Sequence, residues 1–422
     1  MDPRRNPLMK TALIRISRYG LKLFLAALAI TALLYIMVFT PLGNRLVKPL
    51  FQTVLSAYVN APLEVQTFSL NPNSLHLNIR DEHNNLLHLQ GKFSLITQNV
   101  HAMYNADFSH NGGLNTLNLP FKTSGVINGN SDIMNLQGVS EIWEGRISYR
   151  MRMYDFKPSD VQISLIDIHY QNLMQWLELP HESTTLLTGE INLKGLAHRD
   201  VSGVVALQTQ TRHFSPSPII DDNTSFDFLS LFTDDKGKIQ PFRLNLTLKA
   251  SANELGIFEQ FAMLPLRGNA DLRAILQGDH HRLVLEAKSN IARSASHARI
   301  HWKRLRPSYI YLDMKHADAA TLFYLFSRSA PIEGKLSVNA ESNMTHTAGK
   351  ISLLNGLTHP DILKRDYRIT QPKSHFTTSI LLNATPKTIH YNGTFSSDLG
   401  RTTIDDTTTH KGMLRDLLKA LP

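Results

Sequence analysis

The sequence predicts a mostly β protein, with a single N-terminal transmembrane helix followed by an elongated antiparallel sheet and short interspersed helices. Three observations lead to this fold class. Residues 23–40 carry no charge, apolar residues change from helical to two-residue spacing after Pro62, and a strand–short helix–strand unit recurs along the chain. These features indicate a membrane span, strands and an array grown by stacking, respectively.

The charge-free run 23–40 is about as long as a helix needs to cross the hydrocarbon core of a bilayer. Six basic residues and one acidic residue precede it, so we expect residues 1–22 to be a cytoplasmic basic tail. Residues 23–43 are then the transmembrane helix, and the rest lies across the membrane. A cleaved signal peptide is the rival interpretation, but its apolar region is usually shorter and ends in small residues.

Residues 44–61 form the next segment. Leu46, Leu50, Phe51, Val54 and Leu55 recur there at helical spacing, which predicts a short amphipathic helix just beyond the membrane. The apolar side of this helix has two interpretations. It packs on the first strands as a cap, which we favour, or it lies on a lipid surface.

From residue 62 to residue 422 the chain is expected to be mostly strand, because apolar and polar residues alternate in many short segments. Such alternation is typical of antiparallel strands with one apolar and one polar face. The pattern does not decide which face turns inward. The apolar positions that we select as candidates to line that face are Leu75, Leu77, Ile79, Leu244, Leu246, Leu248, Leu283, Leu285, Leu336 and Val338.

A weak internal repeat appears around Gly189, Gly268 and Gly334, each of which we expect to open a strand. Before each glycine lies a segment of about two helical turns, at residues 170–177, 255–261 and 319–326. We expect Trp176, Phe258 and Phe323 to hold these segments on the sheet by burial, since isolated helices this short are unstable. Such a repeat predicts one extended sheet.

Composition excludes several function classes. The chain has no Cys, which rules out disulfides, iron–sulfur clusters and thiol catalysis. Nucleophile-elbow, phosphate-loop and zinc-protease motifs are absent from the sequence, so we expect no enzyme activity, no cofactor and no metal. The adjacent His280 and His281 would point to opposite faces of a strand. The net charge of +9 is concentrated before residue 23, which argues against nucleic-acid binding.

Two segments carry a resemblance to a known family. One is the end of the apolar run, Thr40-Pro41-Leu42-Gly43, and the other is residues 168–180 leading to Leu187-Thr188-Gly189. With the repeated units, they resemble the AsmA-like superfamily of Gram-negative bacteria, which includes AsmA, TamB and YhdP. The resemblance implies an inner-membrane anchor and a periplasmic sheet that is curled into an apolar groove.

The resemblance also implies a function, which is phospholipid transport between the inner and outer membranes. Phospholipids and the inner membrane are then the partners. The alternative is an assembly factor for outer-membrane proteins that carries no lipid and pairs its sheet edge with an outer-membrane protein strand. A groove filled by its own side chains favours the assembly factor, and an open groove favours lipid.

Overall fold

The computed structural model describes residues 35–36, 38–59, 61–94, 97–115, 119–130, 132–155, 157–176, 182–215, 240–259 and 266–408. The described residues are mostly strand, as predicted, and they form two compact units. Unit 1 comprises Met1–Glu141 and Tyr154–Phe156, and unit 2 comprises Ile142–Met153 and Lys157–Pro422. Residues 1–34, which hold the predicted cytoplasmic tail and most of the predicted membrane span, lie outside the described part.

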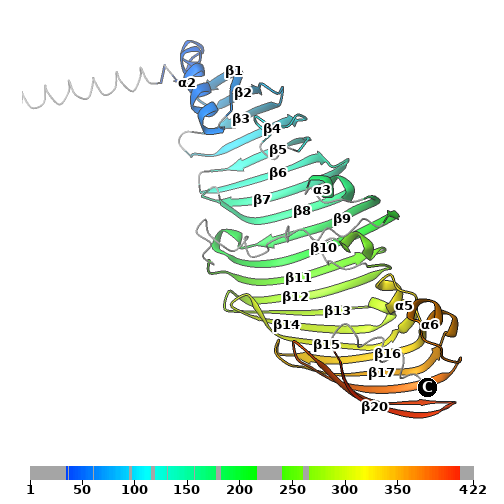
Figure 1. Ribbon diagram of the computed structural model, residues 1–422. Helices are drawn as coiled ribbons and strands as arrows, with labels where there is room; N and C mark the ends of the chain where they lie inside the picture. The colour runs from blue at the N-terminus through cyan, green and yellow to red at the C-terminus, as the bar shows by residue number, and fades with distance from the viewer. Residues whose placement is uncertain are drawn as a thin grey trace, which may run out of the picture. The chain divides into compact units, whose positions relative to one another are not determined.

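The described part of unit 1 includes the helix α2 and a ladder of short strands (Figure 1). Its elements are α2 (Pro41–Val59), β1 (Leu63–Asn71), β2 (Ser74–Asp81), β3 (Leu86–Phe93), β4 (Val100–Phe108), β5 (Phe121–Gly129) and β6 (Ile133–Ile142). From β1 to β5 each strand pairs antiparallel with the next, as two-residue spacing and short connections predict.

Helix α2 confirms the predicted helix after the apolar run, but it begins at Pro41 rather than at residue 44. Thr40 explains the earlier start, because its Oγ1 accepts a hydrogen bond from the Gly43 N–H at 3.2 Å and Pro41 occupies the first helical turn. Residues 41–43, which the sequence suggested as the end of the membrane span, therefore belong to α2.

Unit 2 begins with β7 and contains the longest strands. They are β7 (Gly145–Tyr154), β8 (Lys157–His169), β9 (Glu182–Lys194), β10 (Asp200–Ser215), β11 (Arg243–Ala252), β12 (Ala270–Asp279), β13 (Arg282–Ser289), β14 (Ala295–Lys303), β15 (Arg306–Asp318), β16 (Ile332–Ser342), β17 (Thr347–Thr358), β18 (His375–Ala384), β19 (Ile389–Ser397) and β20 (Gly400–Thr408). From β8 to β20 each strand pairs with the next strand in the chain.

One pair departs from the antiparallel arrangement that the sequence predicts. Strands β10 and β11 are parallel, with Asp200 opposite Arg243 and Thr209 opposite Ala252. A parallel pair needs a long connection that returns the chain to the starting end of the sheet, and the segment between Ser215 and Arg243 is long enough to do so. The alternation of apolar and polar residues within one strand does not show whether its neighbour runs parallel or antiparallel to it.

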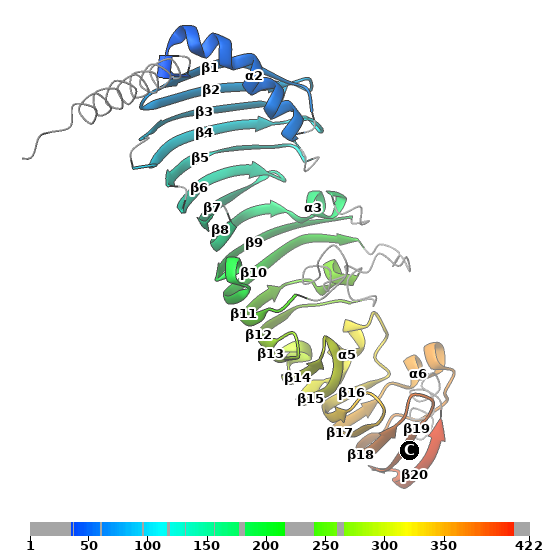
Figure 2. The same ribbon diagram turned by 90° about the vertical axis from the view of Figure 1, so that its left-hand side faces the viewer.

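The short helices of unit 2 lie at one end of its sheet, as Figures 1 and 2 show for α3, α5 and α6. They are α3 (Tyr170–Trp176), η3 (Leu255–Phe258), η4 (Ile291–Arg293), α5 (Ala319–Leu325) and α6 (Pro360–Tyr367). Each follows a strand that runs in the same direction as β8. Because β10 and β11 are parallel, the strands that run in this direction after β10 are the odd-numbered ones, and η3, η4, α5 and α6 follow β11, β13, β15 and β17. The short η1 (Leu196–His198) lies at the opposite end, as do the hairpin turns that follow β12, β14, β16 and β18.

The three predicted helical segments therefore occupy equivalent places, but the glycines beside them do not. Gly189 lies in the middle of β9, Gly268 precedes β12 at a φ of 85°, and Gly334 lies within β16 at a φ of 134°. The feature that α3 and α5 share is instead a bulge in the strand before each helix. Asp167 and His316 adopt positive φ there, three residues before α3 and α5.

The residues that hold the short helices differ in part from those predicted, since of the three only Phe258 packs against the buried cluster of Tyr170, Met174 and Ile257. Trp176 is exposed, and Phe258 and Phe323 are half-buried. The buried anchors are Tyr170 and Met174 of α3, Ile257 of η3 and Leu325 of α5. Burial follows from position in the turn that faces the sheet, so the largest aromatic residue is a poor guide in segments this short.

Candidate functional site

The apolar face of the unit 2 sheet is the candidate site. Residues directly opposite each other in a sheet point to the same face, so the strand register traces that face from strand to strand. It gives one continuous row, Leu246–Leu276–Leu285–Ile300–Ile310, across β11 to β15. A second row, Met314–Val338–Ile351–Ile380, crosses β15 to β18.

All of the selected positions in unit 2 lie on this face. Each alternates with polar neighbours within its strand, and the pairing places the strands in phase. The selected residues in unit 2 are Leu244, Leu246 and Leu248 of β11, Leu283 and Leu285 of β13, and Leu336 and Val338 of β16. The face was therefore predictable in part, and the register supplies its continuity.

Sequence reasoning did not select the residues that join these positions, although it expected a strand after Gly268 and another before residues 319–326. Leu276 of β12, Ile300 of β14 and Ile310 of β15 complete the first row. In β12 and β14 small Ala side chains occupy some of the positions on this face, so the two-residue signal is weaker there. Counting Ala as an apolar position would have revealed β14.

The opposite face of the same sheet is polar. Asn245, Thr247 and Lys249 alternate with the leucines of β11. An ion pair of 2.7 Å between Arg299 Nη2 and Glu286 Oε1 bridges β14 and β13 on that side. Among the paired positions described from β8 to β19, none on the apolar face is Asp, Glu, Lys or Arg. The apolar face is thus free of charge over most of unit 2.

Burial of this face varies along the sheet. Leu244 and Leu283 are buried near the hairpin end, where they cluster with Phe242 and are flanked by Trp302 and Leu305. Between the two ends of the strands the face is only half-buried, since its side chains keep part of their surface exposed. These half-buried residues include Leu246, Leu248, Leu285, Ile300, Ile310, Leu312, Leu336 and Val338.

The last strands behave differently. Leu353, Phe376, Ile380, Tyr391 and Phe395 of β17 to β19 are all buried in one cluster, which also takes in Leu363 of α6. That part of the face is an ordinary closed core. The apolar face of unit 2 is therefore closed by its own side chains at β17–β19 and half-open from β11 to β16.

The selected positions of unit 1 lie in another closed core. Leu75, Leu77 and Ile79 of β2 share one face with Leu87 and Leu89 of β3. Leu77 and Ile79 are buried beneath α2, whose Phe51, Leu55 and Val59 pack against them. These three residues contribute to stability in the same way as any buried apolar side chain.

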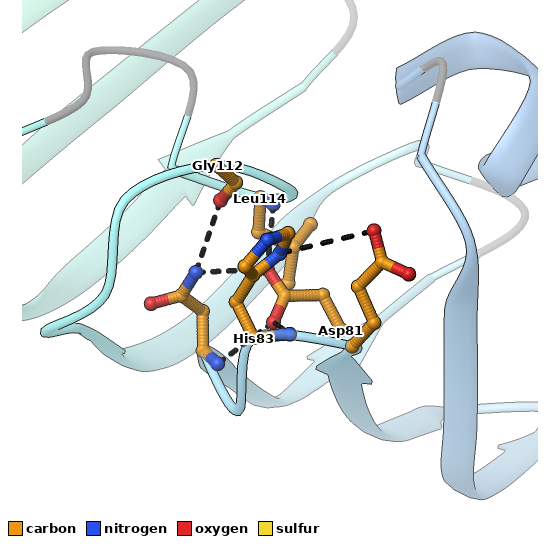
Figure 3. A network of polar contacts seen from close by, with 6 residues as sticks. Asp81, His83, Gly112 and Leu114 are labelled. Atoms are coloured by element: carbon orange, nitrogen blue, oxygen red, sulfur yellow. Dashed lines mark hydrogen bonds and ion pairs between the residues drawn. The ribbon is translucent and has the colours of Figure 1, made fainter.

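A buried polar network in unit 1 escaped sequence analysis (Figure 3). The Asp81 carboxylate accepts hydrogen bonds from the backbone N–H groups of His83, Asn85 and Leu114, at 2.9, 2.8 and 2.8 Å. The Asn85 side chain donates to Asp81 Oδ2 at 2.8 Å and to the Gly112 carbonyl at 3.1 Å. The network joins the β2–β3 turn to the loop at 110–115.

Burial on its own raises the pKa of Asp81, but the hydrogen bonds from Asn85, Leu114 and His83 outweigh it, so this pKa lies below its ordinary value. The carboxylate is therefore a charged structural group whose donors are all on the same unit. In the described part of the chain, no group of three or more His, Asp or Glu side chains is placed to hold a metal ion.

Within the described ranges no helix has both the length and the apolar character to cross a membrane. The charge-free run 23–40 lies mostly outside those ranges, so the membrane span stays a prediction. Comparison of the chain with protein-family models, curated proteins and solved structures found no match.

Proposed function

We propose that this chain is a membrane-anchored, AsmA-like periplasmic protein that carries phospholipid between the inner and outer membranes on the apolar face of unit 2. The observation that carries the proposal is the half-open, charge-free face from β11 to β16. A continuous apolar face that stays partly exposed on a folded sheet is typical of a binding surface for an apolar ligand.

The physical mechanism is passive partition. Each acyl CH₂ that moves from water to an apolar surface gains about 0.8 kcal/mol, so leaving the face is costly. Moving along it costs little, because one row of apolar side chains is followed by another at the strand spacing of about 4.8 Å. No residue acts as a catalyst, and the charged phosphate group of the lipid remains in water.

The sequence supplies the location. Six basic residues precede the charge-free run 23–40 and favour a cytoplasmic N-terminus. The remainder of the chain then lies in the periplasm, anchored once to the inner membrane. This topology would place the apolar face in the aqueous space that a phospholipid must cross.

A matched set of substitutions tests the proposal. Leu285→Asp puts a charge on the apolar face, whereas Val284→Asp puts the same charge on the opposite face of the same strand. The full chain is purified in detergent, and the phospholipid that remains bound is measured by mass spectrometry. We expect loss of bound lipid in Leu285→Asp and retention in Val284→Asp.

The controls decide between outcomes. Far-ultraviolet circular dichroism must be unchanged in both variants, since an unpaired buried carboxylate can unfold a closed core. Equal lipid in wild type, Leu285→Asp and Val284→Asp would contradict lipid carriage. So would a wild-type protein that retains no phospholipid when it is purified from membranes.

The second candidate function is assembly of outer-membrane proteins, and the closed core at β17–β19 favours it. Strand β20, the last one described, pairs with β19 along its length and carries mostly exposed side chains. An incoming strand could extend the sheet at β20. Cross-linking from a cysteine introduced at Thr403 would capture an outer-membrane protein under this alternative and would not under lipid carriage alone.

A further inference from the structure

Helix α2 has two apolar sides, and the sheet uses only one of them. Phe51, Leu55 and Val59 pack on the core of unit 1. Leu46 and Leu55 are nine residues apart, which places them about 180° apart on a helix that turns about 100° per residue. The side that carries Leu46 therefore faces away from the strands.

The outward side is a stripe of large apolar residues. Leu42, Leu46, Leu50 and Val54 follow one another at intervals of four residues, so they line one edge of the helix. Leu42, Leu50 and Val54 are each 68% exposed, and Leu46 is 56% exposed. Four exposed apolar side chains in a row exceed the scattered surface residues that need no explanation.

The inward side of α2 is already fully engaged, because it covers the edge of β1 (Figure 2). The Asn44 side-chain amide pairs with the backbone of Leu70 as a neighbouring strand would, through two hydrogen bonds of 3.1 Å. Gln52 accepts from the Val65 N–H at 3.3 Å, and Lys48 donates to the Gln66 carbonyl at 3.1 Å. These contacts fix the rotation of the helix and keep the stripe outward.

We propose that the stripe Leu42, Leu46, Leu50 and Val54 lies in the surface of the lipid bilayer, so that α2 is an interfacial helix. This inference rests on the membrane anchor of the proposed function. The charge-free run 23–40 ends one residue before α2, so the stripe begins where the chain would leave the bilayer. Its neighbours Tyr35 and Ile36 are also exposed.

The charge of α2 fits the same occupant. The helix contains Arg45 and Lys48 but no Asp or Glu, so it carries a net positive charge. Because Lys48 is bound to the β1 backbone, Arg45 is the exposed cation next to the stripe, and a basic residue in that position is typical of helices that lie on anionic lipid surfaces. The chain also bends at Thr40, and Pro41 disfavours continuation of a straight helix through that residue. A bend there allows α2 to leave the direction of the membrane span.

This arrangement would specify how lipid reaches the protein. Since α2 covers the β1 edge, an interfacial α2 holds the first strands of unit 1 against the membrane that supplies the phospholipid. Docking at the bilayer and carriage on the apolar face of unit 2 are separate properties, and they can fail separately.

The experiment uses the absence of Cys from the chain, which makes any introduced cysteine unique. Full-length Leu46→Cys is labelled with an environment-sensitive fluorophore and reconstituted into liposomes of phosphatidylethanolamine and phosphatidylglycerol that contain a nitroxide-labelled lipid. Glu64→Cys on β1 and Thr403→Cys on β20 are the matched controls, since both positions are exposed and off the stripe. We expect several-fold stronger quenching at position 46 than at either control.

Equal quenching at positions 46 and 403 overturns the inference. So does a pyrene label at position 46 that forms excimers at low protein-to-lipid ratio, because a second copy of the chain would then cover the stripe. A full chain that fails to float with the liposomes removes both the anchor and the stripe. Selective quenching at position 46 in a protein that retains no lipid on unit 2 would refute lipid carriage and leave the interfacial helix standing.

Discussion

The apolar face of unit 2 is closed at β17–β19 and half-open from β11 to β16. A Leu→Ala substitution should therefore lower the free energy of unfolding by different amounts in the two parts. Leu353 of β17 is 1% exposed within a cluster of large side chains, whereas Leu285 of β13 is half-buried. Replacing a fully buried Leu by Ala lowers the free energy of unfolding by about 2–5 kcal/mol, because apolar contact is lost and a cavity remains. We therefore expect about 3–4 kcal/mol for Leu353→Ala.

Leu285→Ala should cost less. Its side chain has partly kept its contact with water, so only part of the transfer free energy is lost and no closed cavity forms. We expect about 1 kcal/mol, or a third of the effect at Leu353. Both residues lie in unit 2 on the same face of the sheet, so the comparison holds residue type and chemistry constant.

The assay is urea unfolding of the detergent-solubilised full chain, followed by far-ultraviolet circular dichroism. The change in midpoint multiplied by the slope gives the change in free energy, provided that the slope is unchanged. Equal losses at Leu353 and Leu285 would mean that the face is covered throughout. The reasoning that separates a closed core from a half-open binding surface would then be wrong.

Four further outcomes follow from the geometry. Because the pKa of Asp81 is lowered in the folded protein, the stabilisation from its carboxylate should be present above about pH 4 and be lost as the pH falls through the folded pKa. In urea titrations, Asp81→Asn should lower the free energy of unfolding at pH 7 and reduce its decrease at acid pH. Asn44→Ala should cost about 1–2 kcal/mol and promote aggregation, measured by light scattering, because it uncovers backbone groups at the β1 edge. Replacing residues 216–239 by a Gly/Ser linker of equal length should preserve the fold by circular dichroism and limited proteolysis, whereas a two-residue turn should not, because a parallel pair needs a long crossover. A reporter enzyme fused after Pro422 should be active only in the periplasm, and cytoplasmic activity would refute the topology.

The sequence predicted the strands whose apolar positions are large. The strand β11 was predicted from Leu244, Leu246 and Leu248, because Leu side chains that alternate with polar residues are typical of a half-buried strand. The strand β14 lacks that contrast, since His and Ala occupy many of its positions. Local pattern also predicted where α3, η3 and α5 lie, since their segments interrupt the two-residue spacing.

Features that depend on distant residues could not be predicted. The bond between Asp81 and the Leu114 N–H joins residues 33 positions apart. The parallel pairing of β10 and β11 is set by the path of the chain between them and leaves no trace in either strand's alternation. Likewise the residue that anchors each short helix depends on the face it turns to the sheet, which is why Tyr170 is buried and Trp176 is not.

The chain covers its apolar surface wherever folding requires it. Helix α2 covers the face of β2 in unit 1, the short helices cover one end of the strands in unit 2, and the cluster around Leu353 closes β17–β19. Between them, β11 to β16 keep a charge-free face whose side chains remain partly exposed. Stability alone gives no reason for such a surface, because a polar residue at Leu285 or Val338 would cost little where burial is incomplete and would improve solubility. Under the proposed function, a phospholipid acyl chain would cover this face and supply that reason.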